Sequence, residues 1–381
     1  MTAIQDTEIP TGWLHAYPHG VMVEYTSRCN LRCKYCSKSN PGDDQIPGRD
    51  QDMSPDTVEA VIAYLQSHQF REVLLAGTGE STFHAHWMED FPRLIHVAKA
   101  ARPGCYVHLN SNFAMKYEDP QWAVLAQLDG IVISVDTADR DLTRDVRAKS
   151  DLGLIVYNIV RFKAYCDSRG LSFPKISINV TLYQDAAKGL PELITMLTAL
   201  PINHVAISDM VETSASAVFA IRPIHADDRA AFSQAVGHVQ EAISRAQTAN
   251  KFTLSVQPFL MQRINALVAQ VNAGVVATTA APVVQEAAAG STKICTQPWT
   301  RFTFAADASI YPCCVTDMSP VGSFALAVDE EAEGLNGSRM RSFRQALLLG
   351  KVPAVCVGCT NAEVGTTLEL QQVVRSIVAS S

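Results

Sequence analysis

Three cysteines stand close together near the N-terminus, in the stretch CNLRCKYC, which contains Cys29, Cys33 and Cys36. They directly follow a strand-like run, so we expect them in a loop at the carboxyl end of a strand, where parallel α/β barrels build their active sites. Thiolates suit zinc or iron–sulfur clusters. Three ligands with no nearby fourth favour a [4Fe–4S] cluster with one iron free for a substrate or cofactor. The alternative is a zinc site that a distant His or Asp completes.

A second group of cysteines lies near the C-terminus, in CTQPWTRFTFAADASIYPCC and VPAVCVGC. Cys295, Cys356 and Cys359, with either Cys313 or Cys314, provide a closed set of four thiolates. A closed iron–sulfur cluster has no open iron, so we expect it to transfer electrons; a structural zinc ribbon is the alternative. Adjacent strand residues point to opposite faces, so we expect one of the neighbouring pair to bind. We favour Cys313, which follows the proline at a hairpin end.

The N-terminal triplet resembles the CxxxCxxC signature of the radical S-adenosylmethionine (radical SAM) enzymes, in which an aromatic residue, here Tyr35, commonly precedes the last cysteine. The stretch LLAGTGES is similar to that family's glycine–glycine–glutamate motif, which holds the methionine amino group. It departs from the motif at its second position, where Thr78 stands. The resemblance therefore implies that S-adenosylmethionine contacts Tyr35, Gly77, Thr78, Gly79 and Glu80.

Polar residues at the ends of later strands complete the cofactor site that this resemblance implies. A zwitterionic sulfonium ligand needs an anion for its ammonium group, a cation for its carboxylate, and amides or hydroxyls for its ribose. The arginine of this set resembles one that pairs with the methionine carboxylate. Taken singly, the strand-end residues could instead cap helices, and the arginine could belong to a solvated charged face. The residues implied are Asn110, Asn112, Ser134, Asp136, Arg147, Asn179 and Met210.

The C-terminal cysteines resemble the SPASM/twitch extension of radical SAM enzymes, with its Cys-x-x-Pro-Trp start, its Pro-Cys-Cys after a β-hairpin and its closing Cys-x-x-Cys. Four ligands fit the shorter twitch form, which holds a single auxiliary [4Fe–4S] cluster. Ala308 departs from the Asp-Gly turn that is usual in this hairpin. The resemblance covers roughly residues 20–215 and 290–362 and leaves 216–289 unassigned.

The resemblance implies a radical reaction. An external one-electron donor such as flavodoxin or ferredoxin would drive cleavage of S-adenosylmethionine to a 5′-deoxyadenosyl radical, which abstracts hydrogen from a substrate carbon. The auxiliary cluster would then take up an electron, so that the net reaction is an oxidation. We expect a small polar metabolite, such as a sugar or aminocyclitol in natural-product biosynthesis, because about twenty residues before the first strand are too few for a leader-recognition domain. The alternatives are a maturase that cross-links, oxidises or epimerises a ribosomal peptide and, from another class, a non-catalytic metal-binding scaffold.

Candidates for acid–base or substrate contacts follow two of the strands. His84 and His86 come after the second strand, and Asp209 and Glu212 after the sixth. The histidines could act near neutral pH. They could equally cap or pack against the next helix.

Apolar runs that alternate with amphipathic stretches predict βαβ units and a parallel sheet. Ser54 and Pro55 mark the start of one helix. We expect an α/β fold, a partial parallel (β/α)6 TIM-like barrel with a small cysteine-rich C-terminal domain, and Cys105 and Cys166 in the core. The expected strands span residues 21–26, 72–77, 105–110, 130–136, 175–181 and 204–210, with a long helix in 225–250, a further strand in 251–257 and a short helix in the C-terminal tail. The expected divisions are an N-terminal extension (1–19), the barrel (20–215), a helical and linker region (216–289), the auxiliary-cluster domain (290–362) and a tail (363–381).

Composition narrows the class of protein. The chain has 381 residues, 48% of them apolar, and its 31 Lys and Arg against 38 Asp and Glu give a net charge of −7. This balance argues against nucleic acid as a partner. We read no signal peptide and no membrane span, and ten cysteines without an export signal favour metal ligands over disulfides. We therefore expect a cytoplasmic metalloprotein.

Overall fold

The computed structural model describes residues 19–39, 50–211, 214–224, 229–272, 291–314, 320–323, 335–357, 359 and 362–379. Its centre is a ten-stranded sheet in the order β13-β12-β11-β1-β3-β4-β5-β7-β8-β9. The strands from β11 to β9 pair in parallel, and β12 and β13 add an antiparallel edge. The strands are β1 (Gly20–Val23), β3 (Glu72–Leu75), β4 (Tyr106–Ser111), β5 (Gly130–Ser134), β7 (Lys175–Leu182), β8 (His204–Asp209), β9 (Thr253–Val256), β11 (Arg301–Phe304), β12 (Ser309–Tyr311) and β13 (Gly322–Ser323).

The expected fold class is confirmed. The six strands predicted for the partial barrel are β1, β3, β4, β5, β7 and β8, and the further strand predicted in 251–257 is β9. Two short ladders lie outside the main sheet: β2 (Arg32–Cys33) pairs with β6 (Arg147–Ala148), and β10 (Ser291–Ile294) pairs with β14 (Glu363–Thr366).

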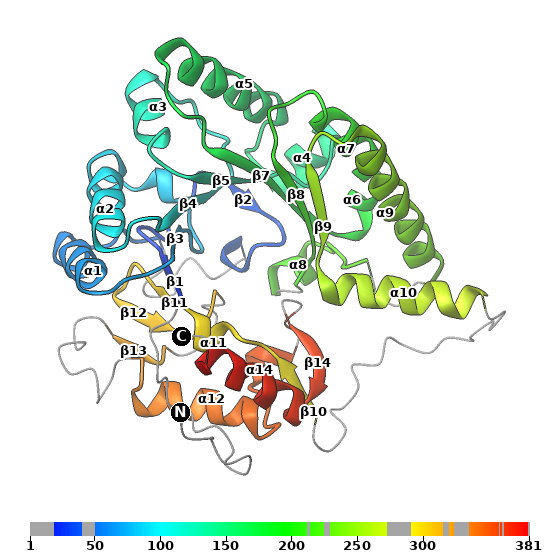
Figure 1. Cartoon of the computed structure of the whole chain (residues 1–381). Coiled ribbons are helices and arrows are strands. Elements are labelled where there is room, and N and C mark those ends of the chain that lie inside the picture. The colour runs from blue at the N-terminus through cyan, green and yellow to red at the C-terminus, as the bar shows by residue number, and fades with distance from the viewer. Residues whose placement is uncertain are drawn as a thin grey trace.

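Helices cover the outer face of the sheet (Figure 1). The Ser54 side chain accepts a hydrogen bond from the backbone N–H of Thr57, and Pro55 opens the first of these helices, as the sequence predicts. The α-helices are α1 (Pro55–Ser67), α2 (Trp87–Ala101), α3 (Asp119–Leu125), α4 (Arg140–Val146), α5 (Leu152–Arg169), α6 (Gln184–Ala187), α7 (Leu190–Leu197), α8 (Ser214–Val218), α9 (Arg229–Ala249), α10 (Pro258–Asn272), α11 (Gln297–Thr300), α12 (Ser338–Leu348), α13 (Ala354–Val357) and α14 (Thr367–Ala379). The single-turn 3-10 helices η1 (Ser37–Ser39) and η3 (Ser81–Phe83) lie in loops.

The two faces of the sheet differ because alternate strand residues point to opposite sides. In β4, Val107 and Leu109 are fully buried in the main core, whereas His108 and Asn110, which alternate with them, are not. The same core encloses Cys105 and Cys166, which confirms the expected burial of these two cysteines. The opposite face is therefore the inner side of the open barrel.

The C-terminal segment continues the barrel sheet. Strand β11 runs parallel to β1, with Gly20 opposite Arg301 and Val23 opposite Phe304. In Figure 1 the remaining C-terminal elements lie below this junction. The division into a barrel and an auxiliary-cluster domain stays an interpretation, since one sheet runs through both.

The β11–β12 hairpin keeps a tight turn despite its departure from Asp-Gly. The N–H of Ala308 donates to the carbonyl of Ala305, and Ala308 adopts a φ of 65°. This is the left-handed position that follows a type I turn in a three-residue hairpin loop and that glycine usually fills.

The tail forms α14, and α9 accounts for residues 229–249 of the predicted long helix. Residues 1–18 and 273–290, which hold most of the N-terminal extension and part of the linker region, lie outside the described residues. In the described part of the chain, every helix is too short or too polar to cross a membrane.

Candidate functional site

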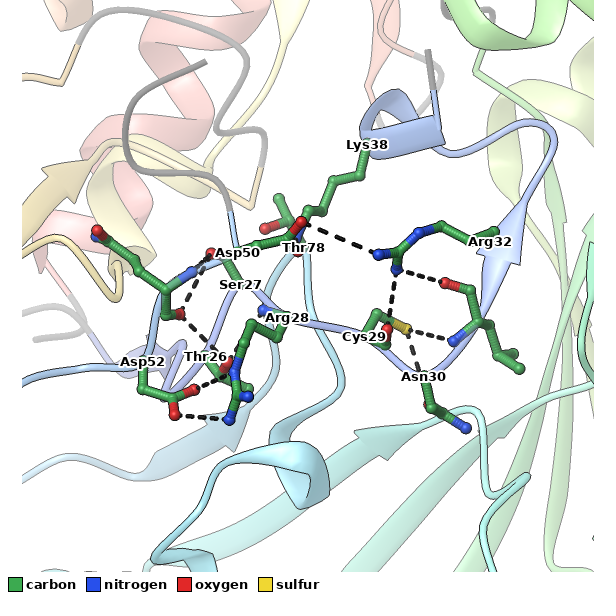
Figure 2. A network of polar contacts seen from close by, with 12 residues as sticks. Thr26, Ser27, Arg28, Cys29, Asn30, Arg32, Lys38, Asp50, Asp52 and Thr78 are labelled. Atoms are coloured by element: carbon green, nitrogen blue, oxygen red, sulfur yellow. Dashed lines mark hydrogen bonds and ion pairs between the residues drawn. The ribbon is translucent and has the colours of Figure 1, made fainter. Parts of the chain in front are cut away.

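The N-terminal cysteine loop follows β1 at its carboxyl end and is held by polar contacts on one side (Figure 2). Arg28 and Asp52 form two hydrogen bonds, Nε to Oδ1 at 2.9 Å and Nη2 to Oδ2 at 2.7 Å. The N–H of Ser27 donates to the carbonyl of Gln51 at 2.9 Å. Bidentate pairing of this kind fixes geometry as well as distance. These contacts therefore fix the position of the backbone directly before Cys29.

The Cys29 sulfur accepts weak hydrogen bonds from two donors. The backbone N–H of Leu31 lies 3.4 Å from Sγ, and Nδ2 of Asn112 lies 3.7 Å from it. The same Asn112 nitrogen donates to Oδ1 of Asn30 at 2.7 Å. Donors aimed at a ligating sulfur orient it and stabilise its thiolate form. Asn112, predicted to contact the cofactor, thus lies beside the first cysteine.

A two-residue ladder joins Cys33 to Arg147. Strands β2 and β6 pair antiparallel with these two residues opposite each other, and the N–H of Lys34 donates to the carbonyl of Val146 at 2.8 Å. The N–H of Cys36 donates to the carbonyl of Cys33 at 3.0 Å, which closes the last turn of the loop. The loop thus runs against the segment that carries the buried arginine.

The charge state of the thiols bears on what the loop can hold. Burial raises the pKa of Cys33 to about 12, with nearby Arg147 opposing this, and burial also raises the pKa of Cys29. Both thiols would be protonated at neutral pH in the absence of a metal. A bound metal supplies the positive charge that deprotonates a coordinating thiol. The residues therefore fit a metal centre.

The arrangement of the possible ligands distinguishes a site for a single metal ion from a site for an iron–sulfur cluster. No three His, Cys, Asp or Glu side chains in the described ranges converge as ligands of a single ion would. A [4Fe–4S] cluster makes a different demand, because its thiolates are distributed over four irons.

The Gly-Thr-Gly-Glu loop after β3 packs directly on the cysteine loop. A Cβ atom at Gly79 would lie 2.3 Å from the carbonyl oxygen of Thr26 and 2.5 Å from that of Arg28, so no side chain fits there. The N–H of Glu80 donates to the carbonyl of Arg28 at 2.8 Å. Glycine is thus required for a close approach of two backbones.

The Glu80 carboxylate is buried, with 2% of the residue exposed, and it joins the ends of β3 and β4. It accepts hydrogen bonds from Thr82 Oγ1 at 2.8 Å, from Ser111 Oγ at 3.0 Å and from the N–H of Asn112 at 2.7 Å. Burial raises the pKa of this carboxyl, and the hydrogen bonds oppose that effect. Its predicted contact with the methionine amino group stays a prediction.

Glu24 is a buried carboxylate that the sequence reasoning missed. It directly follows β1, two residues after Met22, so it lies on the inner face of the barrel. Its Oε1 accepts from the N–H of Thr78 at 2.5 Å and from Thr78 Oγ1 at 2.6 Å. A charged residue at the end of the apolar run VMVEYT was the available signal.

Asp136 and Arg147 are buried and form a polar cluster beside Cys33 with Tyr35, which is partly buried. Arg147 Nη1 lies 3.2 and 3.3 Å from the two carboxylate oxygens of Asp136, and the Tyr35 hydroxyl donates to Asp136 Oδ2 at 2.8 Å. The guanidinium carbon lies 6.0 Å from the Tyr35 ring centre. Arg147 Nε is buried and has no hydrogen-bond partner within the described residues. A buried donor of this kind is costly unless a ligand accepts from it.

The other predicted cofactor contacts fall into two groups. Ser134 lies opposite Asn179 in the β5–β7 ladder, and Ser208 Oγ donates to Asn179 Oδ1 at 3.3 Å. Asn110 is exposed on the same inner face. Met210 is buried in a small cluster against which Tyr35 packs. The residues brought together around the cysteine loop by direct contacts are Tyr35, Gly79, Glu80, Asn112, Asp136 and Arg147.

The histidines after β3 pack against α2. His84 is 4% exposed, its Nδ1 lies 3.5 Å from Asp90 Oδ2, and its ring is 5.5 Å from that of Tyr25. His86 stands at the N-terminal cap position of α2, with its Nδ1 3.1 Å from Glu89 Oε2. These contacts match the alternative that the two histidines cap or pack against the helix that follows them. Asp209 is buried, and Glu212 lies outside the described residues.

The C-terminal cysteines line one pocket. Phe343 and Pro298 contribute apolar walls, and the backbone of the Cys-x-x-Cys stretch is turned by a hydrogen bond from the N–H of Cys359 to the carbonyl of Cys356 at 3.2 Å. Burial raises the pKa of Cys295 to about 12, as it does for Cys356. The cysteines that line the pocket are Cys295, Cys313, Cys314, Cys356 and Cys359.

The choice between the neighbouring cysteines stays a prediction. Cys313 is half-buried and its carbonyl accepts from Thr303 Oγ1 at 2.8 Å, whereas Cys314 is exposed. Both line the pocket, so the lining does not distinguish between them.

Residues 23–173 match the family model of the Radical SAM superfamily. This part of the chain is a radical SAM domain. It contains the cysteine loop, the Gly-Thr-Gly-Glu loop and the Asp136–Arg147 pair, whereas Asn179, Met210 and the C-terminal pocket lie beyond the matched residues. S-adenosylmethionine and a [4Fe–4S] cluster are the cofactors of such a domain.

Two curated relatives share parts of the sequence. A GTP 3′,8-cyclase of Chlorobaculum tepidum is 31% identical over 121 residues, which are 32% of this chain and 34% of the relative. A tungsten-containing aldehyde ferredoxin oxidoreductase cofactor-modifying protein of Pyrococcus furiosus is 24% identical over 192 residues, which are 50% of this chain and 51% of the relative. The matches thus span about a third and about half of these relatives.

Solved structures share the fold over most of the chain. Streptococcus suis SuiB bound to S-adenosylmethionine has a TM-score of 0.58 and 16% identity, over 86% of this chain and 68% of that one. Native anSMEcpe with bound AdoMet has a TM-score of 0.56 and 13% identity, over 90% and 89%. At these identities the likeness shows the fold.

Proposed function

We propose that this protein is a radical SAM oxidoreductase with two [4Fe–4S] clusters. When bound and reduced by an external one-electron donor, the first cluster and S-adenosylmethionine would supply a 5′-deoxyadenosyl radical able to abstract hydrogen from a substrate carbon. The protein binds and orients these groups and keeps water away from them. The observation that carries the proposal is the β2–β6 ladder, which sets Cys33 opposite a buried arginine inside the radical SAM domain.

The protein's own residues supply complementary charges for S-adenosylmethionine. Cys29, Cys33 and Cys36 would hold the first cluster. The buried Nε of Arg147 is a free donor suited to the methionine carboxylate. Asn110 and Asn179, on the inner face of the sheet, would offer amides to the ribose.

The C-terminal pocket would hold the auxiliary cluster. Cys295 directly follows β10, Cys313 and Cys314 follow the β11–β12 hairpin, Cys356 belongs to α13 and Cys359 lies just beyond it, so thiols from separate segments line one cavity. The apolar walls exclude water, which suits electron transfer rather than substrate binding. A cluster placed there would accept an electron and make the net reaction an oxidation.

Two substrate classes follow from this chemistry. Our first candidate is a small polar metabolite that loses two hydrogens. The second is a peptide, because solved neighbours include SuiB bound to precursor peptide SuiA, with a TM-score of 0.56, and anSMEcpe with a Cp18Cys peptide, with a TM-score of 0.57. Product mass separates dehydrogenation, which removes about 2 Da, from epimerisation, which changes no mass.

The first experiment is anaerobic reconstitution with iron and sulfide, followed by reductant and S-adenosylmethionine. Wild-type protein should bind about eight irons, as two [4Fe–4S] clusters require, and release 5′-deoxyadenosine. Cys29→Ala should keep about four irons and release none. Cys105→Ala is the matched control, because Cys105 is buried at the amino end of β4, away from the strand ends that the N-terminal cysteine loop follows, and it does not line the C-terminal pocket.

Two results would overturn the proposal. One is zinc as the bound metal with no iron. The other is an active Cys29→Ala protein that forms 5′-deoxyadenosine at the wild-type rate.

A further inference from the structure

A lysine lies inside the C-terminal cysteine pocket. Lys293 lines this pocket, and only 6% of the residue is exposed. Its Nζ donates to the carbonyl oxygen of Cys359 at 2.9 Å and lies 3.5 Å from that of Ala362. Among the described residues that line the pocket there is no Asp or Glu, and Lys293 is the only cationic side chain.

The position of this lysine is fixed by secondary structure. Lys293 belongs to β10 and lies opposite Val364 in the antiparallel ladder with β14. Thr292, next to it, is buried, and its Oγ1 donates to the carbonyl of Leu347 at 2.7 Å. A charge carried on a paired strand keeps its place better than one on a loop.

We propose that Lys293 is a positioning residue of the auxiliary cluster, with two effects. Its hydrogen bond to Cys359 holds the closing Cys-x-x-Cys stretch, and its positive charge makes the cluster easier to reduce. The inference rests on the proposed function, because it requires an iron–sulfur cluster in the pocket.

The second effect follows from charge. Four thiolates leave a [4Fe–4S] cluster net negative, and one more electron makes it more negative. A cation in a poorly solvated pocket stabilises the more negative state, so it raises the reduction potential. In the proposed reaction, the substrate radical would lose one electron and one proton, the auxiliary cluster would take up the electron, and a one-electron carrier would later remove it. A higher potential favours the first of these transfers.

The test measures the midpoint potential of the auxiliary cluster alone. The parent is the full chain with Cys29, Cys33 and Cys36 all changed to Ala, in which only the C-terminal pocket can hold iron. Potentiometric titration followed by electron paramagnetic resonance, with iron counted, is applied to Lys293→Arg, Lys293→Gln and Lys293→Met. Lys251→Met, an exposed lysine before β9 in the other part of the sheet, is the charge control.

We expect Lys293→Arg and the control to keep the parent potential. Lys293→Gln, which retains a donor without charge, should keep about four irons but titrate at a more negative potential. Lys293→Met should show the same shift together with a lower iron content, since it lacks the donor. Loss of iron in Lys293→Gln to the level of Lys293→Met would contradict the role given to the hydrogen bond.

The inference is overturned if Lys293→Gln and Lys293→Met titrate at the parent potential, or if all three substitutions lose iron alike. If the parent itself binds no iron, the auxiliary cluster of the proposed function is wrong instead. The two failures are therefore distinguishable.

Discussion

Replacing Gly79 with Ala tests whether the contact between the Gly-Thr-Gly-Glu loop and the cysteine loop positions the first cluster. The added Cβ would lie 2.3 Å from the Thr26 oxygen, 2.5 Å from the Arg28 oxygen and 2.7 Å from the Ser27 carbonyl carbon. Ordinary contact is about 3.5 Å, so the loops must separate by roughly 1 Å. All three atoms belong to the backbone, so no side chain can rotate away.

The expected effects are a modest loss of stability and a large loss of activity. Overpacking costs about 1–3 kcal/mol of unfolding free energy. A displacement of about 1 Å next to Cys29 should lower the rate of 5′-deoxyadenosine formation by about 100-fold. Iron content should fall less than the rate, because the thiols remain present.

The assay compares single-turnover 5′-deoxyadenosine formation, iron content and melting temperature. Gly237→Ala is the matched control, because a Cβ there meets no atom within 4 Å and the residue lies inside α9. That substitution should leave the rate unchanged and stabilise the helix by up to about 1 kcal/mol. A Gly79→Ala protein with full iron content and a rate within twofold of wild type would refute the reasoning.

Two further predictions concern stability. The Glu72 carboxylate pairs with Arg301 and lies 2.7 Å from His108 Nε2; the hydrogen bond from His108 and the charge of Arg301 lower the pKa of Glu72 to about 2. The ionised Glu72 carboxylate should stabilise the folded protein fully above pH 4.5, and this contribution should be lost as the pH falls toward 2. We therefore expect Glu72→Gln to lower the free energy of unfolding by about 1–2 kcal/mol at pH 7, after allowance for solvent screening, and by almost nothing near pH 2. Circular-dichroism melts of both metal-free proteins across this range check it, and a difference that does not change with pH would contradict it. Ala308→Gly should raise stability by about 0.5–1 kcal/mol, because it relieves a φ of 65°, and an unchanged or lower melting temperature would count against this account of the turn.

Much of the barrel is predictable because its signals are local. A strand that is buried against helices is visible in the sequence as a short run of apolar residues. A capped amphipathic helix is visible as apolar residues that recur with a period of 3.6 residues. The helix after Ser54 begins and buries its face as these rules require. The cysteine spacing is likewise local, so the loop that carries Cys29 could be located without a structure.

The contacts that complete the site are not local. The β2–β6 ladder has two residues on each strand, and it pairs Cys33 with a residue more than a hundred positions away. No periodicity can be read from two residues. Glu24 was missed for a related reason: its partner, Thr78, belongs to another strand end, and one carboxylate after an apolar run does not show which face it takes.

The pairing of β1 with β11 is also a contact between residues far apart in the sequence, and it links the barrel to the C-terminal segment. The N–H of Glu24 donates to the carbonyl of Phe304 at 2.8 Å, while its carboxylate accepts from Thr78. One residue thus contacts both the loop implied in cofactor binding and the strand that leads into the C-terminal pocket.

Composition and spacing place a boundary between the barrel and the cysteine-rich segment, since each has its own motif. The sheet joins them, because β1 is paired on both edges only when β11 is present. An unpaired strand edge at the site would expose backbone donors and acceptors. The C-terminal segment therefore contributes to the radical SAM site by completing its sheet, independently of any metal it holds.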